Sequence, residues 1–119
     1  MVIRQCVTPA RKPSRSNSLV AWRVRYTGIV VFQWDSTKAA TNLRKHKVDF
    51  HEAATVLKDV LSMTYPDVDH SSYEQRYVTI GISDRKRILV VAHADGPGSI
   101  RIISARKATA HERRFYEEG

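Results

Sequence analysis

The spacing of apolar residues changes from helical to alternating at Lys58, and this change restricts the fold more than any other feature of the chain. Before it, Phe50, Ala53, Ala54 and Leu57 are spaced i, i+3, i+4, i+7, which places them on one face of a helix. After it, short runs of alternating apolar residues are bounded by Pro, Gly and Asp, as is typical of β-strands. The pattern predicts a compact domain that contains both helices and strands.

Capping residues locate the helices. Asp35 and Asp49 are each suited to cap a following helix, and Glu52 is expected to complete a capping box at the second one. Thr109 with Glu112 carries the same signature near the C-terminus. The expected order is a strand at 30–34, helices at 36–47 and 50–57, strands at 61–65, 77–83, 88–94 and 100–105, and a C-terminal helix. The predicted fold class is α+β, with a mostly antiparallel sheet, two N-terminal helices and one C-terminal helix.

Most of the net charge lies outside this predicted domain. The chain carries +8, but residues 1–30 hold six basic residues and no acidic one, which leaves +2 for the remainder. Residues 1–29 contain Arg, Ser and Pro without periodicity, which predicts a basic, disordered leader; an organellar transit peptide is the alternative. Its second half, at 22–31, is expected at most to pair weakly at a sheet edge. The folded domain is expected at 30–119, and a chain that starts near Val30 should keep the activity.

Composition and spacing exclude several classes of protein. No apolar run approaches the roughly 18 residues of a membrane helix, and the single cysteine, Cys6, excludes an internal disulfide, so a cytoplasmic protein is expected. His46 and His51 lie on different helix faces, and the chain has no His-Glu-x-x-His motif or cysteine cluster. A metal site at His70 and its acidic neighbours is less favoured than a polar loop. We expect neither a metal ion nor a cofactor.

Charged residues at the ends of two predicted strands mark a candidate site. Glu74 and Arg76 extend the even-numbered, core-facing side of strand 77–83, so a carboxylate and a guanidinium share one side of the sheet. Two further sets are each expected on a single face: Ile100, Ile102, Ser104 and Arg106 on the last strand, and Lys38, Asn42, Lys45 and His46 on the first helix. If these faces meet, they form a cleft rich in hydrogen-bond donors.

Such a cleft suits RNA cleavage by the neighbouring 2′-hydroxyl, which needs a base for that hydroxyl, an acid for the 5′ oxygen and cations for the phosphate. Glu74 or His46 is the candidate base, and Arg76 and Arg106 are the candidate charge stabilisers. This chemistry requires no metal ion. The alternative for Glu74 and Arg76 is an exposed ion pair that contributes about 0 to 1 kcal/mol.

Two other features have less specific interpretations. Arg85 and Arg87 lie at a predicted hairpin turn, where they are either solvated or in contact with a phosphate. Ser104 has no histidine close to it in the sequence, so it is interpreted as a small strand residue rather than a hydrolase nucleophile.

Several short motifs, taken together, resemble the BrnT toxins of bacterial type II toxin–antitoxin systems over nearly all of residues 31–119. The residues that carry this resemblance are Phe32-Gln33-Trp34-Asp35, Lys38, Asn42, Lys45-His46, Val48-Asp49-Phe50, Glu52-Ala53, His70, Glu74-x-Arg76, Ile80-Gly81, the run from Arg101 to Ala108, Glu112-Arg113 and Tyr116. The resemblance implies a RelE-like α+β ribonuclease that acts on RNA in the cytoplasm. It also implies a BrnA antitoxin that neutralises the toxin and carries the part that binds operator DNA.

The recurring charged motifs of that family match Glu74, Arg76, Arg101, Arg106, Lys45 and His46. At these positions we hypothesise that Arg76 and Arg106 stabilise the phosphate and that Glu74 acts as base or orients an arginine. Our hypothesis assigns RNA binding to Lys45, His46, Arg101 and Lys107, beside the candidate phosphate contacts Arg85 and Arg87.

The match has two departures and leaves two other functions open. One departure is the basic leader, which lies outside the family pattern. Lys47 stands where the family has glycine after Lys-His, at a helix end where a left-handed lysine costs about 1 kcal/mol. The alternative functions are a catalytically silent RNA- or ribosome-binding module and a protein that only assembles with an antitoxin.

Overall fold

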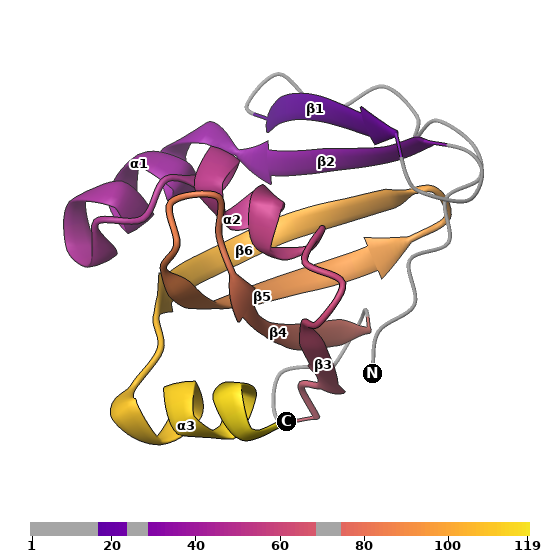
Figure 1. Cartoon of the computed structure of the whole chain (residues 1–119). Helices are drawn as coiled ribbons and strands as arrows, with labels where there is room; N and C mark the ends of the chain where they lie inside the picture. The colour runs from indigo at the N-terminus through magenta and orange to yellow at the C-terminus, as the bar shows by residue number, and fades with distance from the viewer. Residues whose placement is uncertain (1–16, 24–28, 69–74) are drawn as a thin grey trace.

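The computed structural model describes residues 17–23, 29–68 and 75–119, which form one sheet and three helices (Figure 1). The elements in chain order are β1 (Asn17–Arg23), β2 (Ile29–Asp35), α1 (Ser36–His46), α2 (Phe50–Val56), β3 (Met63–Pro66), β4 (Arg76–Ile82), β5 (Ile88–Gly96), β6 (Ser99–Lys107) and α3 (Ala110–Glu118). The strand order in the sheet is β1-β2-β6-β5-β4-β3, with β2 and β6 parallel and all other neighbours antiparallel. The predicted α+β class with a mostly antiparallel sheet is confirmed.

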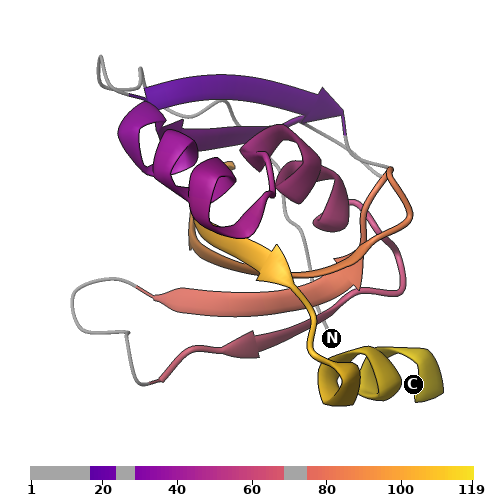
Figure 2. The same cartoon turned by 90° about the vertical axis from the view of Figure 1, so that its left-hand side faces the viewer.

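The sheet separates the helices into two layers (Figure 2). On the inner face, Phe32, Ile102 and Val91 pack against Phe50 and Ala53 of α2, and this cluster is the main core. On the outer face, a smaller cluster forms where α3 lies, and it consists of Ile80, Val90, Ala108, Val78, Ile88 and Tyr116. The names inner face and outer face are used in this sense below.

The even-numbered side of β4 was predicted to face the core, and this prediction is wrong for the main core. Val78 and Ile80 belong to the small outer cluster, while Thr79 and Gly81 face α2 and the segment that follows it. A Cβ at Gly81 would lie 3.0 Å from Cβ of Ser62, so the close approach of that segment requires glycine. Because helices cover both faces, alternation alone does not reveal which face carries the larger core.

A β-bulge in β6 overturns the prediction that Ile100, Ile102, Ser104 and Arg106 share a face. Opposite β5, His93 pairs with Ile102 and Ala92 pairs with Ser104, so Ile103 is an extra residue on β6. Ile102 and Ala105 are both buried in the main core, which leaves two residues rather than one between them. Ser104 and Arg106 therefore lie on the outer face.

The predicted leader contains a strand. β1 pairs along its whole length with β2, from Asn17 opposite Asp35 to Arg23 opposite Ile29, at the edge of the sheet. The prediction of a disordered segment is therefore wrong for residues 17–23, and the predicted edge pairing occurs five residues earlier than expected. A chain that started at Val30 would lack β1 and leave β2 as an exposed edge strand.

The predicted caps are formed with one exception. Asp35 accepts a hydrogen bond from the backbone N of Thr37 at 2.8 Å, Asp49 accepts one from His51 at 2.6 Å, and Thr109 with Glu112 forms a complete capping box. Glu52 does not complete the box at α2, because its carboxylate is engaged by Arg87 and Ser83 instead.

Candidate functional site

The outer face of β6 presents Arg106, whose guanidinium is paired with Glu112 of α3. Nη1 and Nη2 of Arg106 donate to the two carboxylate oxygens of Glu112 at 2.8 and 2.9 Å. The bonds from Arg106, with those from Thr109, lower the pKa of the Glu112 carboxyl to about 2. The bonds to Glu112 also raise the pKa of Arg106. The Arg106 side chain is still 42% exposed, so a phosphate can reach the guanidinium from solvent.

Arg76 and Arg101 form a second cationic group on the same face. Both residues pair with Ala94 of β5, from β4 and β6 respectively, so they flank one small side chain in a single row across the sheet. Gln33 of β2 continues this row beside Arg101. Arg106 pairs with Val90, four residues from Ala94 along β5, so the two cationic groups are roughly 13 Å apart along the strands.

The end of the sheet nearest Arg106 also gathers exposed basic side chains. Figure 1 shows the end of α1, the turn between β4 and β5, and the end of β6 at this end of the molecule. The exposed basic residues on these three segments that were predicted to bind RNA are Lys45, His46, Arg85 and Lys107. We call these four residues the basic end.

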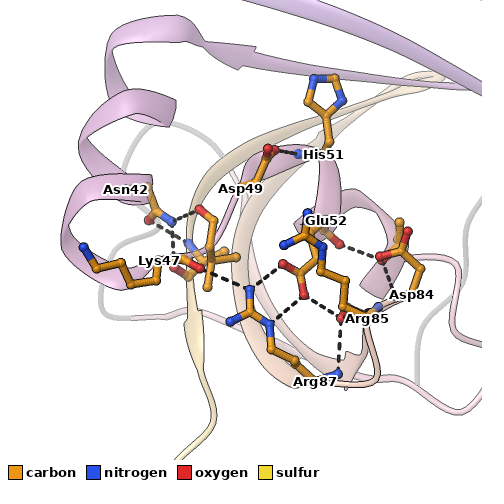
Figure 3. A network of polar contacts seen from close by, with 12 residues as sticks. Asn42, Lys47, Asp49, His51, Glu52, Asp84, Arg85 and Arg87 are labelled. Atoms are coloured by element: carbon orange, nitrogen blue, oxygen red, sulfur yellow. Dashed lines mark hydrogen bonds and ion pairs between the residues drawn. The ribbon is translucent and has the colours of Figure 1, made fainter.

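Arg87, at the end of the β4–β5 turn, forms hydrogen bonds to α2 and to the end of α1. Its Nε donates to Glu52 at 2.9 Å, its Nη2 donates to the other Glu52 oxygen and to the carbonyl of Lys47, and Ser83 donates to Glu52 at 2.7 Å (Figure 3). Burial alone raises the pKa of the Glu52 carboxyl, but the bonds from Arg87 and Ser83 outweigh burial and the pKa lies below its usual value. Arg87 therefore holds the β4–β5 turn against α1 and α2.

The predicted cleft between the helix stripe and the strand arginines is not formed. α1 packs on the inner face, whereas Arg76 and Arg106 lie on the outer face, so the sheet separates the two groups. Asn42 of the predicted stripe is buried and bonds to the backbone of Ala105 and Val48. Glu74 and His70 lie outside the described residues.

Two of the polar groups that the predictions from sequence missed involve residues of β5 and β6. The first is the pairing of Glu112 with Arg106; only its capping role was visible, because the pairing depends on the direction in which α3 leaves β6. The second is fully buried His93, which contacts Asp95 at 2.6 Å and Thr79 at 2.7 Å between β4 and β5. The sequence did contain a signal for this group. A histidine lies inside an apolar strand, and an aspartate two residues later is expected on the same face of that strand.

The described part of the chain has neither a metal-ligand cluster nor a helix suited to cross a membrane. Residues 17–23, 29–68 and 75–119 contain no cluster of three or more His, Cys, Asp or Glu side chains suited to a metal ion. No helix in these ranges is both long and apolar enough to cross a membrane.

Comparison with known proteins identifies similar sequences and structures. The family model described as "Ribonuclease toxin, BrnT, of type II toxin-antitoxin system" matches residues 34–112. The 1.1 Å crystal structure of the Brucella abortus ribonuclease toxin BrnT is similar, with 26% sequence identity and a TM-score of 0.50. That similarity covers 64% of this chain and 92% of the Brucella chain. No curated protein sequence matches the chain.

Proposed function

The chain belongs to the BrnT family of ribonuclease toxins of type II toxin–antitoxin systems, and from this premise we propose that it is an endoribonuclease that cleaves RNA without a metal ion. The single observation that supports this chemistry best is the exposed Arg106 on the outer face, next to the basic end of the sheet. An exposed guanidinium binds phosphate through directed, charge-assisted hydrogen bonds, and the surrounding cations attract the RNA backbone.

The proposed reaction is attack by the 2′-hydroxyl on the adjacent phosphorus. A base removes the proton of the hydroxyl, the 2′ oxygen forms a bond to phosphorus, and the bond from phosphorus to the 5′ oxygen breaks. The leaving oxygen takes up a proton, so the products are a 2′,3′-cyclic phosphate and a 5′-hydroxyl end. Positively charged donors accelerate this step because negative charge accumulates on the phosphate oxygens in the transition state.

We assign roles by position. Arg106 and Arg76 stabilise the phosphate, and Glu74, two residues before Arg76, acts as base or orients an arginine. The residues that hold RNA are Arg101 and those of the basic end, Lys45, His46, Arg85 and Lys107. Arg87 supports this surface from within, since Glu52 and the Lys47 carbonyl engage its guanidinium.

The proposal extends to the partner and the place of action. A BrnA-like antitoxin binds and neutralises the protein, and operator DNA is contacted only through that antitoxin. The fold is proposed to be RelE-like and the activity cytoplasmic. Type II systems have a protein antitoxin, so membership of the family supports a protein partner.

Incubation of the purified protein with RNA in EDTA tests the activity. We expect cleavage that persists in the chelator and falls about a hundredfold or more in Arg106→Ala and in Arg76→Ala, because each removes a charge that stabilises the transition state. Lys38→Ala, an exposed change on α1, is the matched control and should cleave like the wild type. Circular dichroism of each variant shows whether the fold is retained.

The same experiment separates the alternative functions. RNA binding without cleavage by the folded wild-type protein would favour a catalytically silent RNA- or ribosome-binding module. Neither binding nor cleavage would favour a protein whose activity is assembly with an antitoxin.

A further inference from the structure

We propose that Ser104 is an additional substrate-contacting residue, whose hydroxyl donates a hydrogen bond to a non-bridging oxygen of the RNA phosphate between Arg101 and Arg106. This inference rests on the proposed ribonuclease function and names a group on β6 that neither the family match nor the predictions from sequence assign to the site.

The bulge at Ile103 places Ser104 on the arginine-bearing face. Without the extra residue, strict alternation would place Arg101 on the opposite face from Ser104 and Arg106. With it, Arg101 pairs with Ala94, Ser104 with Ala92 and Arg106 with Val90, and all three β6 residues lie on the outer face. Bulges commonly re-aim side chains beside active sites, and this one aligns a hydroxyl with two guanidinium groups.

The spacing along β6 fits a single ligand. The β5 partner of Ser104, Ala92, is two residues from the partner of Arg106 and two from the partner of Arg101, which corresponds to about 7 Å along the strands to each arginine. Long arginine side chains on both sides can therefore bind a phosphate that also touches the short hydroxyl between them. Because a serine hydroxyl is a donor without charge, it adds direction to the electrostatic attraction of the arginines.

Ser104 is also accessible and uncommitted in the described part of the chain. It is exposed, although Ile102 and Ala105 near it on the same strand are buried. Its cross-strand neighbour, Ala92, is small, and its hydroxyl makes no hydrogen bond with the residues that the structure describes.

The test uses two shape-matched substitutions in the full-length chain. Ser104→Thr keeps a hydroxyl, and Ser104→Val replaces the same hydroxyl by a methyl group, while both are compatible with a strand. We expect kcat/KM for RNA cleavage to fall roughly ten- to a hundredfold in Ser104→Val relative to Ser104→Thr, as for a lost hydrogen bond to a charged group. Ser99→Ala, on the same strand and face beyond Arg101, is the control and should cleave like the wild type.

A second readout distinguishes contact from positioning. RNA with one non-bridging oxygen at the cleaved phosphate replaced by sulfur is prepared as its two separate diastereomers. If the hydroxyl donates to one of these oxygens, the ratio of the two cleavage rates will differ between wild type and Ser104→Val and will be unchanged in Ser104→Thr and Ser99→Ala.

The outcomes separate this inference from the proposed function. Equal kcat/KM for the Thr and Val variants, or an unchanged diastereomer ratio in Ser104→Val, overturns the role of Ser104 while RNA cleavage by the wild type still supports a ribonuclease. Absence of cleavage by the folded wild-type protein overturns both.

Discussion

The side-chain amide of Asn42 pairs with the backbone of Ala105 as a neighbouring strand would. Its Nδ2 donates to the Ala105 carbonyl at 2.8 Å, and its Oδ1 accepts from the Ala105 N–H at 3.0 Å. The same Nδ2 donates to the carbonyl of Val48 at 3.0 Å. One buried side chain on α1 thereby holds the backbone of β6 between Ser104 and Arg106, the residues that carry the proposed site.

Asn42→Ala should destabilise the fold by about 3 kcal/mol, because it leaves the buried N–H and C=O of Ala105 without these partners. Urea denaturation followed by circular dichroism measures the loss. Lys38→Ala on the exposed side of the same helix should change the free energy of unfolding by less than about 0.5 kcal/mol. Equal stability of the two variants would show that the Asn42 contacts contribute little.

Glu112 should make the stability depend on acid pH. Its pKa is about 2 in the folded protein, held down by Arg106, against an ordinary value of 4.5. The pairing therefore stabilises the fold above about pH 4.5, and this contribution is lost as the pH falls towards 2. Because Arg106 is substantially exposed, solvent screening limits the contribution to about 1 to 2 kcal/mol.

Glu112→Gln removes that titration and is the matched variant. Its stability should fall less steeply than that of the wild type between pH 4.5 and 2. Denaturation midpoints measured across this range give both slopes. Parallel curves would mean that the pairing with Arg106 is not formed in solution.

Loss of Glu52 should destabilise the fold more than loss of Glu112, because the Glu52 side chain is 3% exposed and the Glu112 side chain is 25% exposed. Glu52 as a whole residue is only 4% exposed, so Glu52→Ala leaves a partly buried guanidinium and the Ser83 hydroxyl without their acceptor. We expect a loss of about 3 kcal/mol in the free energy of unfolding. Arg85→Ala, in the same turn but exposed, should lose less than about 0.5 kcal/mol.

Lys47→Gly should stabilise the protein. Lys47 ends α1 with φ 62° and ψ 31°, in the left-handed region that glycine enters without a Cβ penalty. The expected gain is about 1 kcal/mol, since the carbonyl that accepts from Arg87 belongs to the backbone and is retained. Lys45→Gly, inside the last turn of α1, should instead lose about 1 kcal/mol, so thermal denaturation of the two variants should give shifts of opposite sign.

Local features of the sequence predicted most elements and their ends. Asp35, Asp49 and Thr109 cap their helices as predicted, because capping depends on residues two or three positions away. The apolar positions of α2 are buried as predicted, because the helical period alone brings them to one side. The sequence also indicated the left-handed end of α1 at Lys47, since the resemblance places glycine there.

The candidate site was less predictable, because long-range contacts decide it. One extra residue, Ile103, moved Ser104 and Arg106 to the outer face, and no local signal distinguishes a bulged strand from a regular one. Asn42 looked like part of a polar helix surface until the packing of α1 on β6 buried it. Likewise, Arg87 looked like an exposed turn residue, but Glu52 lies 35 positions earlier and engages its guanidinium.

The sequence by itself determined the order of helices and strands, the helix caps and the α+β class, since periodicity and capping are properties of neighbouring residues. The tertiary structure alone decided which charged groups share a surface. The strand register, the bulge and the direction of α3 depend on the packing of both the main core and the outer cluster. The sheet therefore had to form before one surface could contain Arg76, Arg101, Ser104 and Arg106.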